Sequence, residues 1–210
     1  PVKKQDRRFK IVCFHTFGRY GFMARSATET RSRILNAAGI LFSSHGYCGA
    51  SLDDIVVAAG ITNGAFYHYF KSKEVCIALL DQALAQTDGF FDTPSTDTPQ
   101  ETLRHWARQI ANSEQTGASG MFRLVLRLSS DLPLFSNPIP DKIKRIWEEQ
   151  ITHLEALIAS LPDRNPTCKD ARRAALLILS IFIGALRLGQ IPVADLEADQ
   201  LLETAIRLIF

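Results

Sequence analysis

Apolar residues recur three and four positions apart along most of this chain, a spacing that gathers them on one face of an α-helix. The pattern begins at Ile34 and continues towards the C-terminus. Alternation with a period of two, which indicates a half-buried β-strand, is almost absent. The sequence therefore predicts an all-α protein of about nine helices.

Three helices are predicted near the N-terminus, and each has a recognisable start. Ser26-x-x-Glu29 is a capping box, in which the serine oxygen and the glutamate carboxylate accept hydrogen bonds from backbone N–H groups at the helix start. Gly46 is expected to end this first helix with a positive φ angle. Ser51-x-x-Asp54 begins a second helix that ends at Gly60, and Thr62 caps a short third helix.

Six further helices are predicted downstream, separated by segments rich in proline, glycine and small polar residues. The fourth begins at Ser72 and runs to about Thr87. The others are expected over residues 100–112, 120–129, 141–160, 169–188 and 195–209.

The second and third predicted helices have the apolar spacing of a helix-turn-helix. Buried side chains from both helices must meet across the turn to fix their crossing angle, and the turn itself needs a residue with positive φ, here Gly60. The expected meeting positions are Ile55, Ala59, Ile61 and Phe66. The opposite face of the third helix would then expose Thr62, Asn63, Gly64, Tyr67 and His68. Taken alone, this pattern also fits an ordinary helical hairpin.

The segments on either side of this motif resemble the TetR family of bacterial regulators. The similar elements occur in order between Arg31 and Leu80: Thr30-Arg-x-x-Ile-Leu-x-Ala-Ala, Leu41-Phe42, Gly46-Tyr47 and Phe66-Tyr-x-Tyr-Phe-x-Ser-Lys-Glu74. Val56 departs from the family's usual alanine, and Ala50 from a threonine whose hydroxyl could contact phosphate. The resemblance implies an N-terminal three-helix DNA-binding domain over residues 23–73 and a C-terminal ligand-binding and dimerisation domain over residues 74–210.

By this resemblance the third helix enters the major groove of operator DNA. Tyr67, His68 and Lys73 would contact phosphates, which leaves Thr62, Asn63 and the opening at Gly64 to read bases. With no arginine or glutamine on this face, we expect DNA shape to contribute to specificity. Asn63 could instead be a helix-start residue, and His68 an exposed or capping histidine. The candidate DNA-binding residues are Arg31, Ser51, Thr62, Asn63, Gly64, Tyr67, His68, Lys71 and Lys73.

The helix predicted over residues 169–188 is apolar on nearly every face and must be covered all round. A second copy of the chain would supply that cover, because this helix and the one over residues 195–209 would form half of an intersubunit four-helix bundle. The alternative is a core helix within one chain. The candidate interface residues are Leu177, Ser180, Ile181, Gly184, Leu188, Leu202 and Ile206.

Polar and aromatic residues embedded in the buried faces of the fifth to eighth helices are candidates to line an effector pocket. They are His105, Trp106, Gln109, Phe122, Arg123, Trp147, His153 and Phe182, although each also fits an ordinary core or surface position. An inward-pointing Arg123 would favour an anionic or carbonyl-bearing effector. The resemblance thus predicts a repressor that binds a palindromic operator as a homodimer and is released by a small molecule.

The net charge of +2 hides a segregation along the chain. Residues 1–22 carry +5, residues 23–73 carry +2 and residues 74–210 carry −5. Met23 stands just before the first expected helix, so we interpret it as the natural initiator and residues 1–22 as a disordered tag or other non-native extension. The alternative is a basic arm that grips DNA phosphates.

The cysteines and histidines give little support to other functions. Cys13, Cys48, Cys76 and Cys168 lack C-x-x-C spacing, so neither a metal nor a disulfide framework is expected, and a cytoplasmic location fits. One alternative keeps the DNA-binding half but places a redox or electrophile switch at Cys76 or Cys168, which would otherwise be small buried hydrophobes. A less favoured alternative is an α-helical enzyme, because the dispersed histidines form no catalytic motif. We expect no cofactor, and no membrane partner because the apolar stretch Ala174–Leu186 is too short to span a bilayer.

Overall fold

The computed structural model describes residues 27–86, 98–111, 117–161 and 170–188, together with Thr204 and Arg207. All of the regular secondary structure in these ranges is helical, which confirms the predicted all-α class. The α-helices are α1 (Ala27–Gly49), α2 (Leu52–Ala59), α3 (Asn63–Tyr69), α4 (Val75–Gln86), α5 (Pro99–Ala111), α6 (Gly117–Ser130), α7 (Ile139–Ala159) and α8 (Ala171–Leu188). Two 3₁₀ turns, η1 (Ser72–Glu74) and η3 (Leu132–Leu134), connect them.

Several predictions lie outside the described residues. They are the cap at Ser26, the segment 1–22, the helix over residues 195–209 with Leu202 and Ile206, and the thiol of Cys168. The side chains of Gln109 and Leu188 also fall outside, although the backbone of both residues is helical.

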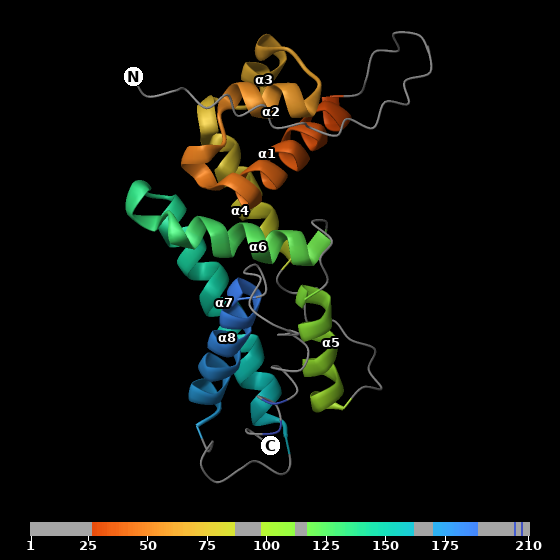
Figure 1. The fold of residues 1–210 in the computed structure, drawn as a ribbon, viewed down its shortest axis with the longest axis vertical. Coiled ribbons are helices and arrows are strands. Elements are labelled where there is room, and N and C mark those ends of the chain that lie inside the picture. Colours follow the sequence, from red (N-terminus) through yellow and green to blue (C-terminus); the bar gives the residue numbers. More distant parts are fainter. Residues whose placement is uncertain are drawn as a thin grey trace, which may run out of the picture.

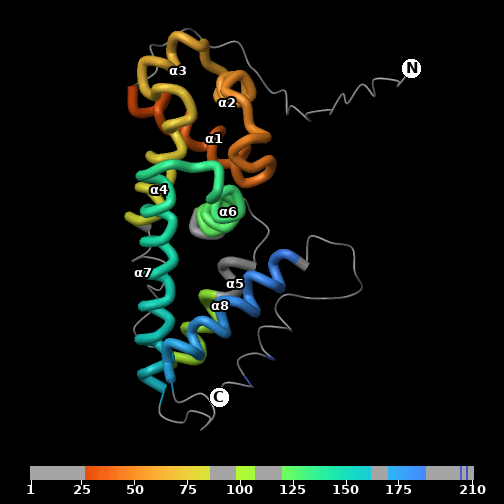
Figure 2. The backbone as a smooth tube through the Cα atoms, turned by 90° about the vertical axis from the view of Figure 1, so that its left-hand side faces the viewer, coloured from red at the N-terminus to blue at the C-terminus, as the bar shows by residue number. Residues whose placement is uncertain are grey.

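The helices form two packed groups that meet at α6. Figure 1 shows α1, α2 and α3 at one end of the molecule, α6 lying across the middle, and α5, α7 and α8 at the other end. One hydrophobic core joins α1–α4 to α6 and the first half of α7, and a second core joins α5, α6, α7 and α8. Figure 2 shows α7 as a long rod that runs from α4 to the far end of the molecule. Side chains of α4, α6 and α7, which lie beyond residue 73, therefore complete the core beneath the helix-turn-helix.

The turns of the N-terminal group follow from local sequence. Gly46 has φ 75° and kinks the helical span α1, and Gly60 has φ 60° at the end of α2, as predicted for both. Ser51 and Asp54 form the predicted capping box, with Ser51 Oγ accepting from the Asp54 amide at 3.1 Å and the Asp54 carboxylate accepting from the Ser51 amide at 3.1 Å. Because the Ser51 hydroxyl and amide donate to its charged form, the pKa of Asp54 is lowered.

The predicted start of the fourth helix at Ser72 is wrong. Ser72 has φ 55°, the left-handed region that cannot continue an α-helix, so residues Ser72–Glu74 form a 3₁₀ turn and α4 begins at Val75. The start of α6 is also earlier than predicted, at Gly117 rather than at residue 120.

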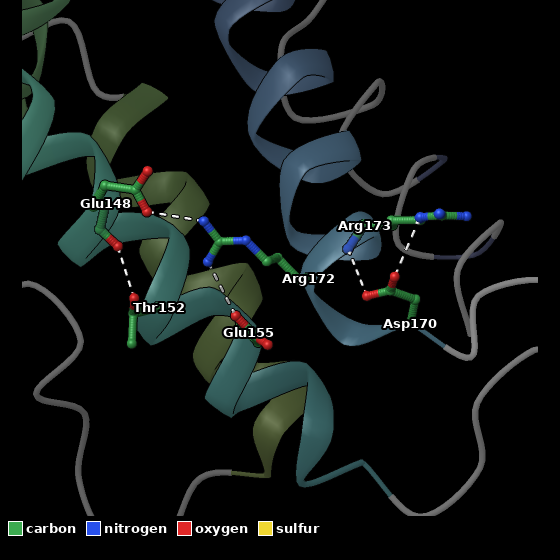
Figure 3. Close-up of polar contacts among 6 residues, drawn as sticks. All are labelled: Glu148, Thr152, Glu155, Asp170, Arg172 and Arg173. Carbon is green, nitrogen blue, oxygen red and sulfur yellow. Dashed lines mark hydrogen bonds and ion pairs between the residues drawn. The ribbon is translucent and has the colours of Figure 1, made fainter.

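Helices α7 and α8 are joined on their outer side by ion pairs, shown in Figure 3. Arg172 reaches from α8 to Glu148 at 2.9 Å and to Glu155 at 3.4 Å, both on α7, while Arg173 pairs with Asp170 at 3.2 Å. All of these side chains are substantially exposed, so solvent screens the charges and the pairs add little to folding stability. The apolar contacts beneath them hold the two helices together.

Candidate nucleic-acid interface

Helix α3 presents one buried and one exposed face. Its start is fixed by Thr62, whose Oγ1 accepts a hydrogen bond from the Ala65 amide at 3.2 Å. Phe66 is fully buried against the core of the N-terminal group. The side of α3 away from this core carries the polar and aromatic residues predicted to face outwards, and all of them are exposed: Thr62, Asn63, Gly64, Tyr67 and His68.

The four meeting positions of the helix-turn-helix are buried or partly buried, as their spacing predicted. Ile55 and Phe66 are fully enclosed, Ala59 is nearly so, and Ile61 packs against the same core. Val56 is buried too, so its extra volume relative to the family's usual alanine lies inside the packing of α2.

Arg33 of α1 holds the turn between α2 and α3 in place, a role that sequence reasoning missed. Its Nη2 donates to the carbonyl oxygens of Ala59 and Gly60, the second at 3.1 Å. These are carbonyls at the C-terminal end of α2, where a cation also opposes the negative end of the helix dipole. The sequence signal for this role is weak, because an arginine on a largely polar helix face is ordinarily solvated.

Aromatic contacts set the direction of the exposed side chains. Tyr67 meets Phe66 edge-on, with ring centroids 5.8 Å apart and an interplanar angle of 89°, and its own side chain is 56% exposed. His68 stacks on Tyr69 at 5.0 Å and 19°. The Tyr67 phenol therefore packs against the Phe66 ring and the His68 imidazole against the Tyr69 ring, and both residues stay exposed.

The remaining candidates at this end differ in how they are placed. Arg31 and Lys71 are exposed, and the Arg31 guanidinium lies 5.5 Å from the centre of the Phe70 ring. The Ser51 side chain is engaged in the cap of α2. The Lys73 side chain turns towards α1 instead. Its ammonium donates to the Tyr47 carbonyl at 2.6 Å and lies 4.7 Å from the centre of the Tyr47 ring. The structure therefore gives Lys73 a contact that fastens η1 to the end of α1.

Ala50 does not face outwards, as a phosphate-contacting hydroxyl at this position would require, because its side chain is fully buried in the first core. A threonine there would add its hydroxyl to the interior, so the substitution changes packing.

The effector-pocket candidates do not converge on one cavity. Trp106, Phe122 and Phe182 form a buried aromatic cluster, with the Phe182 ring 5.0 Å from Trp106 and 5.8 Å from Phe122. Trp147 joins it through Phe122 at 5.4 Å, and its indole N–H donates to Ser129 Oγ at 2.8 Å. This aromatic cluster packs α5, α6, α7 and α8 together.

The polar candidates lie outside that cluster. His105 is exposed rather than embedded in a buried face, because it precedes the buried Trp106 by one position and successive helical residues point about 100° apart. His153 lines an open crevice between α4 and α7, and Arg123 lines another between α1, α6 and α8. Gln150 was missed: it is 4% exposed, and its Oε1 has no hydrogen-bond partner among the described residues.

Four of the predicted interface residues form an uncovered stripe on α8. Leu177 is 47% exposed, Ser180 is exposed, and Ile181 and Gly184 are half-buried, at the i, i+3, i+4 and i+7 spacing of one helix face. A Cβ built on Gly184 would meet no atom within 4 Å. The opposite face of α8, with Ile178 and Phe182, is buried in the second core.

The cysteine alternative loses support at Cys76. This side chain is fully buried in the first core, and burial raises the pKa of its thiol to about 12, so the reactive thiolate is disfavoured. Cys48, which was not a candidate, is exposed. Among the residues that the structure describes, no cluster of His, Cys, Asp and Glu could hold a metal ion, and no helix is long and apolar enough to cross a membrane.

Comparisons with known proteins agree with this geometry. Residues 34–80 match the family described as bacterial regulatory proteins, tetR family. The chain is 29% identical over 175 residues to the HTH-type transcriptional regulator TtgR of Pseudomonas putida, an alignment that covers 83% of this chain and 73% of TtgR.

Solved structures show the same fold over most of the chain. A TetR-family transcriptional regulator from Agrobacterium tumefaciens superposes with a TM-score of 0.73 at 20% identity, covering 88% of this chain and 99% of that protein. The reduced form of Escherichia coli NemR superposes with a TM-score of 0.70 at 19% identity, covering 86% and 97%. With its helix-turn-helix matched in sequence and its remaining helices matched in fold, this chain belongs to the TetR family of bacterial transcriptional regulators.

Proposed function

We propose that this protein is a repressor that binds a palindromic operator as a homodimer and is released by a small molecule. The exposed polar face of α3 carries the proposal. That face is uncovered, is held by packed aromatic rings and by Arg33, and offers hydrogen-bonding groups at the helix start where recognition helices contact bases.

Each part of this face suits a different contact with DNA. Thr62, Asn63 and Gly64 lie at the N-terminal end of α3, so they would meet base edges, where asparagine can pair with adenine. Tyr67 and His68 follow one turn later and would contact phosphates, as would the exposed Lys71 beyond the helix. These phosphate contacts would position the helix without selecting a sequence.

The α8 stripe supports the homodimer. Leu177 and Ile181 leave apolar surface exposed, and Ser180 and Gly184 are small enough to let a second helix approach closely. Pairing two such stripes about a two-fold axis would present two α3 helices to two half-sites about one helical turn apart, roughly 34–36 Å.

The effector is proposed to act on the C-terminal group. The aromatic cluster of Trp106, Phe122 and Phe182 offers apolar contact surface, and Gln150 offers a buried oxygen acceptor on α7. A small molecule that binds the non-DNA-binding geometry more tightly would shift the dimer towards it.

Selection from a random pool of DNA duplexes tests the proposal without knowledge of the operator. Purified protein is incubated with the pool at about 0.1 M salt, where non-specific binding through counterion release is weakened, and bound duplexes are amplified and sequenced. We expect enrichment of an inverted repeat. Failure to enrich any sequence, or enrichment of a single half-site without symmetry, would overturn the proposed dimeric operator binding.

A further inference from the structure

A crevice of about 430 Å³ lies where α1, α6 and α8 approach one another. Its size suits a small organic molecule. It adjoins the second core, in which its wall residues Leu126 and Leu186 also pack, but none of the rings of the aromatic cluster lines it. The lining residues used below are Ser44 of α1, Arg123, Leu126 and Arg127 of α6, and Leu186 and Arg187 of α8.

Three arginines gather around this crevice. Arg123 and Arg127 are one turn apart on α6, so they share a helix face, and Arg187 comes from the last turn of α8. Arg187 Nη2 donates to Ser130 Oγ at 3.0 Å and to the Leu126 carbonyl at 3.4 Å, which directs its guanidinium towards α6.

Two of these guanidinium groups have buried donors that are not used. The Nε atoms of Arg123 and Arg127 are buried and have no hydrogen-bond partner among the described residues. The carboxylate closest in sequence, Asp131, accepts from the Tyr47 amide at 2.9 Å. Asp131 Oδ2 and Arg127 Nε each lie 2.9 Å from the point where a Cβ on Gly46 would stand, so this carboxylate offsets part of the Arg127 charge. Within the described ranges, none of the three arginines forms an ion pair with a carboxylate.

Buried donors that are left unused are costly, and an anion would satisfy them. An arginine has five N–H donors in a planar fork, which matches the paired oxygens of a carboxylate or a phosphate. Three arginines with one nearby carboxylate and no ion pair leave the site with a net positive charge, which favours a negative ligand. Leu126 and Leu186 add apolar wall beside the charges.

We propose that this crevice binds a small organic anion, with its carboxylate or phosphate held by Arg123, Arg127 and Arg187 and its apolar part lying against Leu126 and Leu186. The site joins the two helix groups, since Arg127 Nη2 also donates to the His45 carbonyl of α1 at 3.4 Å. A Cβ added at the neighbouring Gly46 would lie 2.8 Å from the same Nη2, so α1 and Arg127 are in close contact there. An anion that draws Arg127 towards it would therefore weaken this contact.

The regulatory consequence rests on the proposed function: binding of the anion would change operator affinity, because the Arg127 contact ends on α1, whose Arg33 holds the turn between α2 and α3. Anion binding itself needs no DNA. The two are therefore measured separately, first by titration of the protein alone and then by operator binding with and without the bound anion.

Isothermal titration calorimetry with three eight-carbon probes tests the site. Sodium octanoate carries a carboxylate, octyl phosphate carries a phosphate, and 1-octanol has the same chain without a charge. We expect saturable binding of at least one anionic probe at about one per chain, and at least tenfold weaker binding of 1-octanol. Whichever anion binds more tightly identifies the head group.

Two variants and a control then locate the binding. The double variant Arg123→Gln/Arg187→Gln should weaken anion binding at least tenfold, and Ser44→Glu, which places a negative charge at an exposed position on the crevice wall, should do the same without altering the core. Arg173→Gln, an exposed arginine elsewhere on α8, is the matched control and should bind as the wild type does. Circular dichroism melting confirms that each variant folds. The proposal is overturned by no saturable binding of either anion, by equal binding of 1-octanol, or by unchanged binding in folded Ser44→Glu.

Discussion

The exposed face of α3 and the exposed stripe of α8 are both uncovered, but their chemistry is opposite. The α3 face carries hydroxyl, amide, imidazole and phenol groups, whereas the α8 stripe carries the apolar Leu177 and Ile181 together with the small Ser180 and Gly184. Both are built the same way underneath, on a helix whose other side is locked into a core by a fully or nearly fully buried phenylalanine, Phe66 or Phe182.

The difference indicates which partner each face can take. Polar groups that hydrogen-bond well with water lose little when they exchange water for a hydrated, charged surface such as DNA. Exposed apolar side chains gain from removal of water and small ones permit close packing, which suits another protein helix. A regulator that reads a palindrome needs both surfaces, one for the nucleic acid and one for the second subunit.

The largest effect is expected from breaking the α8 stripe. Leu177→Glu would bury a charge in the proposed interface, so the protein should run as a monomer in analytical ultracentrifugation at micromolar concentration, and operator affinity should fall at least about 100-fold. Leu134→Glu, at an exposed apolar position in η3, is the matched control and should stay dimeric with unchanged operator affinity. If the Leu177→Glu protein stayed dimeric, the α8 stripe would not be part of the dimer interface.

A smaller effect is expected on the α3 face. Asn63→Ala removes a side chain proposed to read a base and should weaken operator binding by about 1–3 kcal/mol, measured by fluorescence anisotropy, while leaving the dimer intact. Asn36→Ala changes the same residue type at an exposed position of α1 and should bind like the wild type. Equal operator affinity of Asn63→Ala and the wild type would show that Asn63 serves only as a helix-start residue and reads no base.

Lys71 and Lys73 should separate phosphate contact from structure. Lys71→Gln removes an exposed cation from each subunit, so the slope of log K against log salt should become shallower by about 2 for the dimer, with little change in Tm. Lys73→Gln should instead lower Tm by a few degrees, because it breaks the hydrogen bond to the Tyr47 carbonyl. The reverse assignment of slope and Tm would contradict the roles given to these two residues.

The smallest effect concerns the cap that sets the start of α2. Ser51→Ala should reduce the free energy of unfolding by about 1 kcal/mol, which chemical denaturation at neutral pH measures. Because the pKa of Asp54 is lowered in the folded protein, the stabilisation from its carboxylate is present above its ordinary pKa and is lost as the pH falls through the folded value. The difference between Ser51→Ala and the wild type should therefore shrink below about pH 4, and a constant difference would show that the carboxylate contributes nothing.

The N-terminal half could be predicted in detail because its geometry is set by local chemistry. Ser51 and Gly60 fix where α2 begins and ends, Thr62 fixes the start of α3, and apolar spacing then decides which face of α3 is buried. Contacts between distant segments could not be predicted, such as those of Arg33 with the Gly60 carbonyl and of Lys73 with the Tyr47 carbonyl. Nothing in either residue's neighbourhood in the sequence marks its distant acceptor.

The C-terminal half could be predicted as helices but not as a site. Periodicity gave the extents of α5, α7 and α8 to within about two residues, yet the ligand candidates were chosen without knowing which faces would meet. His105 and Trp106 are neighbours in sequence but only Trp106 is enclosed. Likewise, Phe122 is buried in the second core while its neighbour Arg123 lines an open crevice. Those outcomes depend on how four helices pack, which no single segment specifies.

The most direct test of a dimer that reads DNA through α3 compares two duplexes, the selected palindrome and the same duplex with one half-site scrambled. Two protomers should bind the palindrome, and the affinity for the scrambled duplex should be at least about 100-fold lower, as measured by anisotropy titration at fixed salt. Equal affinity for the two duplexes, or one protomer bound to each, would contradict this prediction.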